Sequence, residues 1–200
     1  MTTTLITNAH IATGEPGSTA ASTLPLQDIL VTDGVFTAFG PGLAQQYEAQ
    51  GGDLAAIEVV DLGGKLVCPP FCDTHLHLDY VFTARKPGAV NASGTLFEGS
   101  QRWSETKSDL TVDEIKQRAK IGLKKAMPHG EQLIRSHADV TDPNLTSLKA
   151  LLELKEELKD TVTLQIVSFP QEGMYAYEGP HGESGAELVE EGLKMGADCV

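Results

Sequence analysis

The sequence predicts an α/β protein: an incomplete TIM (β/α)8 barrel preceded by a small antiparallel β-sandwich unit. Three observations support this fold class. Short β-branched runs separated by turn residues come first, strand-like and helix-like segments alternate after Pro69-Pro70, and polar residues collect where each later strand ends. The sequence therefore predicts a β unit over residues 1–67, followed over residues 68–200 by three βα units and the start of a fourth strand.

Composition and charge limit the classes of function. The chain has 200 residues, of which 40% are hydrophobic and 22% charged, as is ordinary for a globular protein with a buried core. Its formal net charge of −13 disfavours nucleic acid and anionic membranes as partners, because both carry the same sign. A small partner that is neutral or cationic fits better. Whether the protein forms a homo-oligomer is left open.

The expected location is cytoplasmic. No apolar run approaches the length of a membrane span, and the N-terminus lacks a basic segment followed by an apolar one. The three cysteines do not match a disulfide framework, which agrees with a reducing compartment.

The first unit reads as strands joined by turns. The runs LITNAHIAT, QDILVTDGVFTAFG and AIEVVDLGGKLVCP are rich in β-branched residues. The pair Asp33-Gly34 predicts a hairpin turn, and Gly63-Gly64 suits the tight turn of another hairpin. Residues 13–24 and 40–55 are rich in small and polar residues, which predicts surface loop with one short helix.

Strands and helices alternate in the second unit. The predicted strands are FCDTHLHLD, QLIRSHADV and TVTLQIVSFP, and ADCV starts a fourth. A long polar connection follows the first strand. The helices are TVDEIKQRAKIGLKKAM, LTSLKALLELKEELK and GAELVEEGLKMG; in the first, Ile115, Ala119 and Leu123 recur at helical spacing. Since no hairpin joins the strands, they are expected to be parallel and connected by right-handed crossovers.

Polar residues at the strand ends favour a barrel. The three strands end in His75, His77 and Asp79, then in His137 and Asp139, then in Gln171 and Glu172 just past the third. Functional groups at the carboxyl ends of successive parallel strands suit a TIM barrel, although open doubly wound sheets also bind ligands there. The absence of a glycine-rich phosphate loop from the sequence disfavours the open sheet.

The segment FCDTHLHLD predicts a metal site. Residues i and i+2 of a strand share a face, so His75 and His77 point the same way, with Asp73 and Asp79 in the same row. Two imidazoles on one face can hold one divalent metal ion, and both Zn²⁺ and Fe²⁺ suit them. The alternative is a half-exposed strand with solvent-facing histidines. We disfavour it because a parallel sheet should be covered on both faces.

The same residues carry a resemblance. An HxH pair that ends the first barrel strand after a small β unit resembles the amidohydrolase superfamily. The segments SGTLFEG at 93–99, RW at 102–103 and FPQEG at 169–173 are similar to those of bacterial-type cytosine deaminases. The resemblance covers nearly all of residues 69–200. It implies a metal-dependent hydrolase whose partner is a small-molecule, nucleobase-like substrate. The enzyme would attack the amino-bearing carbon of a pyrimidine ring and convert cytosine to uracil and ammonia.

The resemblance also implies roles for individual residues. His75 and His77 match the family's first two metal ligands, and Gln171 matches the glutamine that binds the pyrimidine through its amide. Leu96 matches a position whose backbone faces the substrate. The alternative for Gln171 is a helix-entry cap, and for Leu96 it is core packing. His137 is interpreted as support for a ligand, with a satisfied buried histidine as the alternative.

The family's remaining ligands and its proton-shuttling residues lie on later barrel strands. A TIM barrel needs eight βα units, and the residues after Leu66 supply three and the start of a fourth. We therefore expect the catalytic residues beyond residue 200 and no activity in residues 1–200 alone. The alternatives are a related aminohydrolase acting on isocytosine, a triazine or another cyclic amidine, a non-catalytic truncated homologue, or a structural module. Trp103 is either a pocket wall or a core residue.

Overall fold

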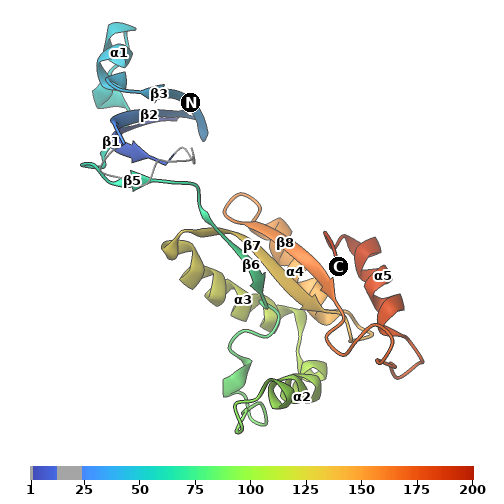
Figure 1. Cartoon of the computed structure of the whole chain (residues 1–200). Helices are drawn as coiled ribbons and strands as arrows, with labels where there is room; N and C mark the ends of the chain where they lie inside the picture. Colours follow the sequence, from blue (N-terminus) through green and yellow to red (C-terminus); the bar gives the residue numbers. More distant parts are fainter. Residues whose placement is uncertain (1, 13–23) are drawn as a thin grey trace. The chain divides into compact units, whose positions relative to one another are not determined.

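The computed structural model describes residues 2–12 and 24–200 (Figure 1). Contacts divide the chain into two compact units, of which the first ends at Pro69 and the second runs from Pro70 to Val200. In the described ranges, no helix combines the length and the apolar character that crossing a membrane requires. Most of the predicted loop over residues 13–24 lies outside the described residues.

The first unit contains one mixed sheet of five strands. They are β1 (Thr3–Ile11), β2 (Leu26–Thr32), β3 (Val35–Gly40), β4 (Glu58–Asp61) and β5 (Leu66–Val67). The order is β3-β2-β1-β4, and β5 also pairs with β1. β2 is antiparallel to both β1 and β3, but β4 and β5 run parallel to β1. The predicted antiparallel β-sandwich is therefore wrong, since the described part of this unit forms a single mixed sheet.

The two predicted hairpin turns have different outcomes. Asp33 and Gly34 join β2 to β3 with φ values of 48° and 78°, as a tight hairpin turn requires. Gly63 and Gly64 also have positive φ, but they connect β4 to β5, which both pair with β1. The second predicted hairpin is wrong, because β4 and β5 do not pair with each other there but both run parallel to β1. The segment over residues 40–55 contains the short helix α1 (Leu43–Ala49) and the start of the 3-10 helix η2 (Leu54–Ala56).

The second unit contains a parallel sheet with its strands in sequence order. These are β6 (Phe71–Leu76), β7 (Glu131–Asp139) and β8 (Thr163–Phe169). A parallel bridge between Val167 and Cys199 begins a fourth strand beside β8. The connecting helices form where the sequence predicts them: α3 (Val112–Ala126), α4 (Thr146–Glu157) and α5 (Gly185–Met195). Parallel strands in sequence order with helical connections are the arrangement with which a TIM barrel begins.

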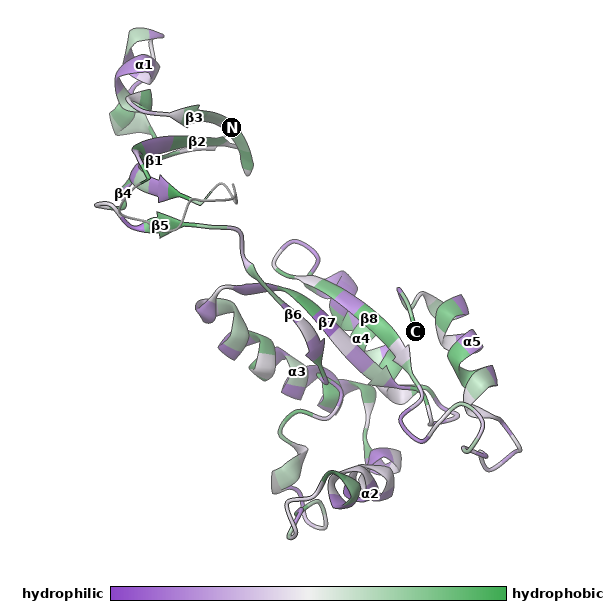
Figure 2. Ribbon diagram, viewed as in Figure 1, coloured by the Kyte–Doolittle hydropathy of each residue, from purple (hydrophilic) through white to green (hydrophobic). Residues whose placement is uncertain are grey.

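The core of the second unit lies between the sheet and its helices. Ile115, Ala119 and Leu123 of α3 are buried, as their helical spacing predicts. In Figure 2, α3 and α5 alternate between hydrophilic and hydrophobic colours, as helices with one buried face do. On the other face of the sheet, Leu133 is 39% exposed and His75 is exposed. The prediction that both faces are covered is therefore wrong for the described residues.

The long connection between β6 and α3 is not all loop. It contains the 3-10 helix η3 (Thr83–Arg85), α2 (Leu96–Thr106) and the 3-10 helix η4 (Lys107–Asp109). The Thr95 hydroxyl accepts the backbone N–H of Glu98 and so caps the start of α2. Figure 1 shows α2 beyond the ends to which the arrows of the sheet point. The connection therefore builds a wall at the carboxyl end of the strands.

Candidate active site

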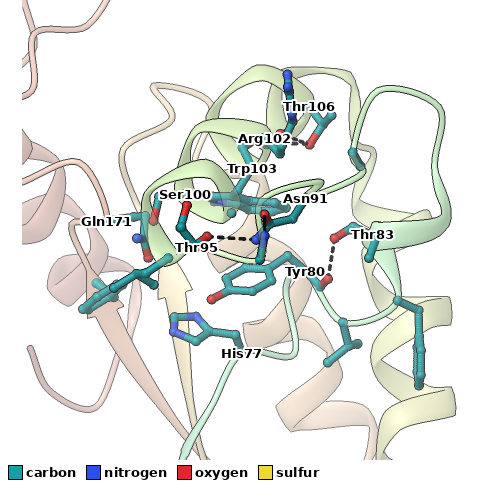
Figure 3. Close-up of a pocket in the computed structure, with 18 of the residues that line it drawn as sticks. His77, Tyr80, Thr83, Asn91, Thr95, Ser100, Arg102, Trp103, Thr106 and Gln171 are labelled. Carbon is teal, nitrogen blue, oxygen red and sulfur yellow. Dashed lines mark hydrogen bonds between the residues drawn. The ribbon is translucent and has the colours of Figure 1, made fainter.

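A cavity of about 800 Å³ lies at the carboxyl end of the parallel sheet. The end of β6, the connection after it, α2 and the end of β8 all contribute to its lining. Figure 3 shows the His77 ring below the ring of Tyr80, with Trp103 behind and Gln171 at one side. A cavity of this size and position is typical of a small-molecule site.

The two predicted metal ligands both line this cavity. The ring centroids of His75 and His77 are 5.4 Å apart. Nδ1 of His77 lies 3.0 Å from the backbone carbonyl oxygen of His137. Because a carbonyl oxygen can only accept, Nδ1 carries the proton, and the lone pair of His77 is on Nε2. That is the tautomer in which Nε2 can bind a metal ion.

His137 supports the pair through both its backbone and its ring. Its carbonyl orients His77, and its imidazole stacks on His75 with the centroids 4.0 Å apart and 19° between the planes. Burial, and then the proximity of His75 and His77, lowers the pKa of His137. The third imidazole is therefore neutral at pH 7, and it adds no charge beside the pair.

Asp73 does not share the row of the two histidines. The pairing of β6 with β7 is irregular between Asp73 and Leu76, which breaks the alternation of a regular strand. The carboxylate of Asp73 accepts the backbone N–H of His75 at 2.9 Å, and Asp73 lines a separate hollow with Leu76. The prediction that Asp73 lies in one row with His75 and His77 is therefore wrong.

Asp79 departs from the predicted row in another way, because it is fully buried. Its carboxylate lies 3.6 Å from Nδ1 of His77 and accepts the backbone N–H groups of Tyr80 and Asp139, at 3.1 and 2.9 Å. Burial raises the pKa of Asp79, and the hydrogen bonds from His77 and Asp139 oppose that rise. Asp79 thus lies close to His77 but does not line the cavity.

Gln171 and Leu96 both line the cavity. Gln171 lies in the turn after β8, where its backbone N–H donates to the carbonyl of Phe169 at 3.1 Å. Because Gln171 lines the cavity, its side-chain amide can reach a ligand there. Leu96 is the first residue of α2 and is 80% exposed, so the core-packing alternative for it is wrong.

Aromatic rings form much of the remaining wall. Tyr80 stacks on His77 with the centroids 4.5 Å apart, and Trp103 lies 4.8 Å from Tyr80. Phe169 meets His77 edge-on at 5.5 Å. Burial raises the pKa of Tyr80 to about 12, so its phenol remains a hydrogen-bond donor at neutral pH. Sequence reasoning missed Tyr80, although it directly follows the segment that carries the histidines.

Trp103 combines the two roles that its sequence context left open. It lines the cavity and is only 5% exposed, and its indole N–H donates to the Asp139 carboxylate at 2.7 Å. Asp139, at the end of β7, therefore contributes to the site indirectly.

The donor set fits part of a metal site. Zinc or iron would accept the imidazoles of His75 and His77 as two ligands. Across residues 2–12 and 24–200, no group of three or more His, Cys, Asp or Glu side chains could hold a metal ion. The pair thus suits two positions of a coordination shell and does not complete one.

Both a family model and solved structures match this chain. A model of the amidohydrolase family matches residues 58–193, more than half of the chain. The crystal structure of 5-methylcytosine deaminase from Klebsiella pneumoniae, liganded with 5-fluorocytosine, is similar with a TM-score of 0.77 and 36% identity. The similarity covers 97% of this chain and 42% of that chain.

Two curated relatives carry names that refer to other compounds. N-isopropylammelide isopropyl amidohydrolase of Pseudomonas sp. (strain ADP) is 33% identical over 145 residues, which are 70% of this chain and 35% of the relative. Pterin deaminase of Rhizobium rhizogenes is 28% identical over 152 residues, 74% of this chain and 32% of the relative. The chain thus spans about a third of the length of these two proteins.

Proposed function

The chain belongs to the amidohydrolase family, and from this premise we propose that its cavity is part of the active site of a metal-dependent deaminase. The substrate that we propose is a pyrimidine-type ring, with cytosine converted to uracil and ammonia. The observation that carries the proposal is the joint lining of one cavity by the His75/His77 pair and by the amide of Gln171. The 36% identity to a deaminase, over nearly the whole chain, supports the choice of ring.

His75 and His77 would hold the metal ion. The proton on Nδ1 of His77, fixed by the carbonyl of His137, keeps Nε2 free for that role. A divalent ion bound there supplies the activation of water for attack on carbon. Zinc and iron both suit imidazole ligands, so the donor set does not choose between them.

Gln171 would bind the edge of the ring. A carboxamide offers one acceptor and two donors, which complements the alternating polar groups of a pyrimidine. Tyr80 and Trp103 supply flat apolar surfaces against which an aromatic ring can pack. Leu96, at the start of α2, would bring its backbone to the other side of the ring. These residues would bind and orient the substrate and exclude water from around it.

The names of two relatives favour a second candidate for the ring. Relatives of this chain carry the names of hydrolases of N-isopropylammelide and of pterin, so one scaffold serves several heterocycles. A related aminohydrolase acting on isocytosine, a triazine or another cyclic amidine is therefore the second candidate.

We also propose that residues 1–200 alone are inactive. Two imidazoles provide half of a usual four-ligand shell, which implies weak metal binding. Among the described residues that line the cavity, none is a carboxylate that could relay a proton to a leaving amino group. General acid–base assistance, typically about 10²–10⁴-fold, would then be missing.

The test is ammonia release by the full-length protein over a panel of rings: cytosine, 5-methylcytosine, isocytosine, a triazine and a pterin. Gln171→Leu keeps the side-chain size and deletes the amide, leaving ring polar groups unpaired at about 1–3 kcal/mol each. We expect activity to fall at least about tenfold with metal content unchanged.

Gln101→Leu is the matched control, because Gln101 is exposed on α2, bonds to Glu105 and does not line the cavity. It should retain full activity. Unchanged kinetics in Gln171→Leu would remove that residue from the site, and no ammonia from any ring would overturn the proposed function.

A further inference from the structure

The helix that walls the cavity has little apolar anchorage of its own. Trp103 is the single buried residue of α2, whereas α3 buries three residues and α4 buries five. Leu96 and Phe97 at its start are 80% and 86% exposed. Apolar packing alone therefore does not fix the position of α2, and polar contacts must contribute more to it than to the other helices.

Those polar contacts converge on Lys107, the residue that follows α2. Its ammonium group donates to the Asp139 carboxylate at 3.0 Å and to the Thr141 hydroxyl at 2.9 Å, and it also pairs with Glu172. The Lys107 side chain is 10% exposed and that of Asp139 only 1%, so this ion pair is desolvated. Loss of one partner from such a pair leaves a buried charge without compensation.

Asp139 connects this cation to the cavity wall and to the histidines. One oxygen of its carboxylate accepts from both Lys107 and the Trp103 indole, at 3.0 and 2.7 Å. Its backbone N–H donates at 2.9 Å to Asp79, whose carboxylate lies 3.6 Å from Nδ1 of His77. The end of β7 is therefore hydrogen-bonded both to α2 and to the support of the imidazole pair.

Glu172 connects the same cation to the turn after β8, which carries Gln171. It directly follows Gln171, and its carboxylate accepts from Lys107 and from the Ser104 hydroxyl, the latter at 2.9 Å. Lys107 thus contacts two residues that lead to the cavity. One is Asp139, which accepts from the Trp103 indole, and the other is Glu172, the neighbour of Gln171.

From these contacts we propose that Lys107 is a positioning residue, which sets the separation of Trp103 and Gln171 across the cavity by binding Asp139 and Glu172 together. The proposal rests on the proposed function for the role of Gln171. Lys107 does not line the cavity, so it acts through the residues that it holds and not on the substrate.

Trp103 provides the test, because it is the only tryptophan of the chain. Lys107→Met keeps the length of the side chain and removes its charge. In the 200-residue chain carrying Lys107→Met, we expect the fluorescence emission of Trp103 to shift to longer wavelength. The quenching of Trp103 by acrylamide should increase at least about twofold. In the full-length protein, the KM for the best ring of the panel should rise about tenfold, with a smaller change in kcat. Lys107→Arg should restore most of both properties.

Lys116→Met is the matched control. Lys116 is 13% exposed and pairs with Glu153 and Glu157, so it is a comparably buried cation between two carboxylates, but it joins α3 to α4. Glu172→Ala is a second variant for the case that Lys107→Met does not fold, because Glu172 is 34% exposed and its removal leaves Asp139 paired. It should raise KM with a smaller change in Trp103 emission.

The outcomes separate the two proposals. A Trp103 shift in Lys107→Met that is absent from Lys116→Met, together with the rise in KM, would support positioning. Unchanged emission and quenching in folded Lys107→Met, equal effects in Lys116→Met, or a loss of kcat alone would overturn it. If the unmodified protein turns over no ring, the proposed function fails, and the fluorescence comparison still decides whether Lys107 holds Trp103.

Discussion

Replacing Ser136 by alanine should destabilise the second unit at the base of the site. Ser136 is fully buried on β7, and its hydroxyl oxygen accepts the backbone N–H of Leu78 at 3.0 Å. Leu78 is itself fully buried and lies between His77 and Asp79. Alanine is smaller by one oxygen atom, and it leaves this buried N–H without an acceptor.

The magnitude follows from the cost of an unpaired buried donor, which is about 1–3 kcal/mol. For a chain of this size, each kcal/mol corresponds to a fall of about 2–4 °C in Tm. The expected loss for Ser136→Ala is therefore about 2–12 °C. Zn²⁺ binding should also weaken, because the segment that carries His77 loses an anchor.

Ser168→Ala is the matched control for this substitution. Ser168 is equally buried on β8, but its hydroxyl donates to the carbonyl of Val189 at 3.2 Å, inside α5. That carbonyl keeps its helical N–H partner when the hydroxyl is removed. Urea and thermal unfolding, followed by far-UV circular dichroism, should show a larger loss for Ser136→Ala. Equal losses, or an unchanged Tm for Ser136→Ala, would refute the reasoning.

Two further predictions concern pH and packing. Hydrogen bonds from Ser93 lower the pKa of Glu98 from 4.5 to about 2 in the folded chain, so ionised Glu98 contributes stability that is present above pH 4.5 and lost as the pH falls towards 2. Glu98→Gln should thus be less stable than the unmodified chain at neutral pH, and the difference should shrink as the pH falls from 4.5 through 2; a difference independent of pH would contradict this. A Cβ at Gly192 would lie 2.4 Å from the Ser168 hydroxyl oxygen and 3.1 Å from Leu148, so Gly192→Ala should lower the free energy of unfolding by about 1–3 kcal/mol. Adding Ser168→Ala should recover part of that loss in thermal unfolding, and an unchanged Tm in Gly192→Ala would show that the helix can move away.

The regular elements of the second unit could be predicted because local patterns specify them. The spacing of Ile115, Ala119 and Leu123 predicts the buried face of α3, and the structure buries all three. The polar residues at the strand ends likewise predicted the position of the site. Polar residues at the carboxyl ends of parallel strands share one edge, and His75, His77 and Gln171 do line one cavity.

Features that depend on contacts distant in sequence could not be predicted. α2 buries only Trp103, and the indole of Trp103 bonds to Asp139, which is 36 residues away. The parallel pairing of β4 and β5 with β1 likewise joins segments that are far apart along the chain. The displacement of Asp73 from the histidine row comes from an irregular register that strict alternation does not anticipate.

Joint coordination of one ion by His75 and His77 can be measured directly by a Zn²⁺ titration of the isotope-labelled chain, with the imidazole nitrogen shifts recorded by NMR. We predict that Nε2 of His77 shifts while Nδ1 keeps its proton, and that His75 shifts at the same Zn²⁺ concentration. His129 and His181, which do not line the cavity, should remain unchanged. His75→Ala should weaken binding at His77 by about tenfold or more. Independent titration of the two histidines, or unaltered affinity in His75→Ala, would contradict a shared metal site.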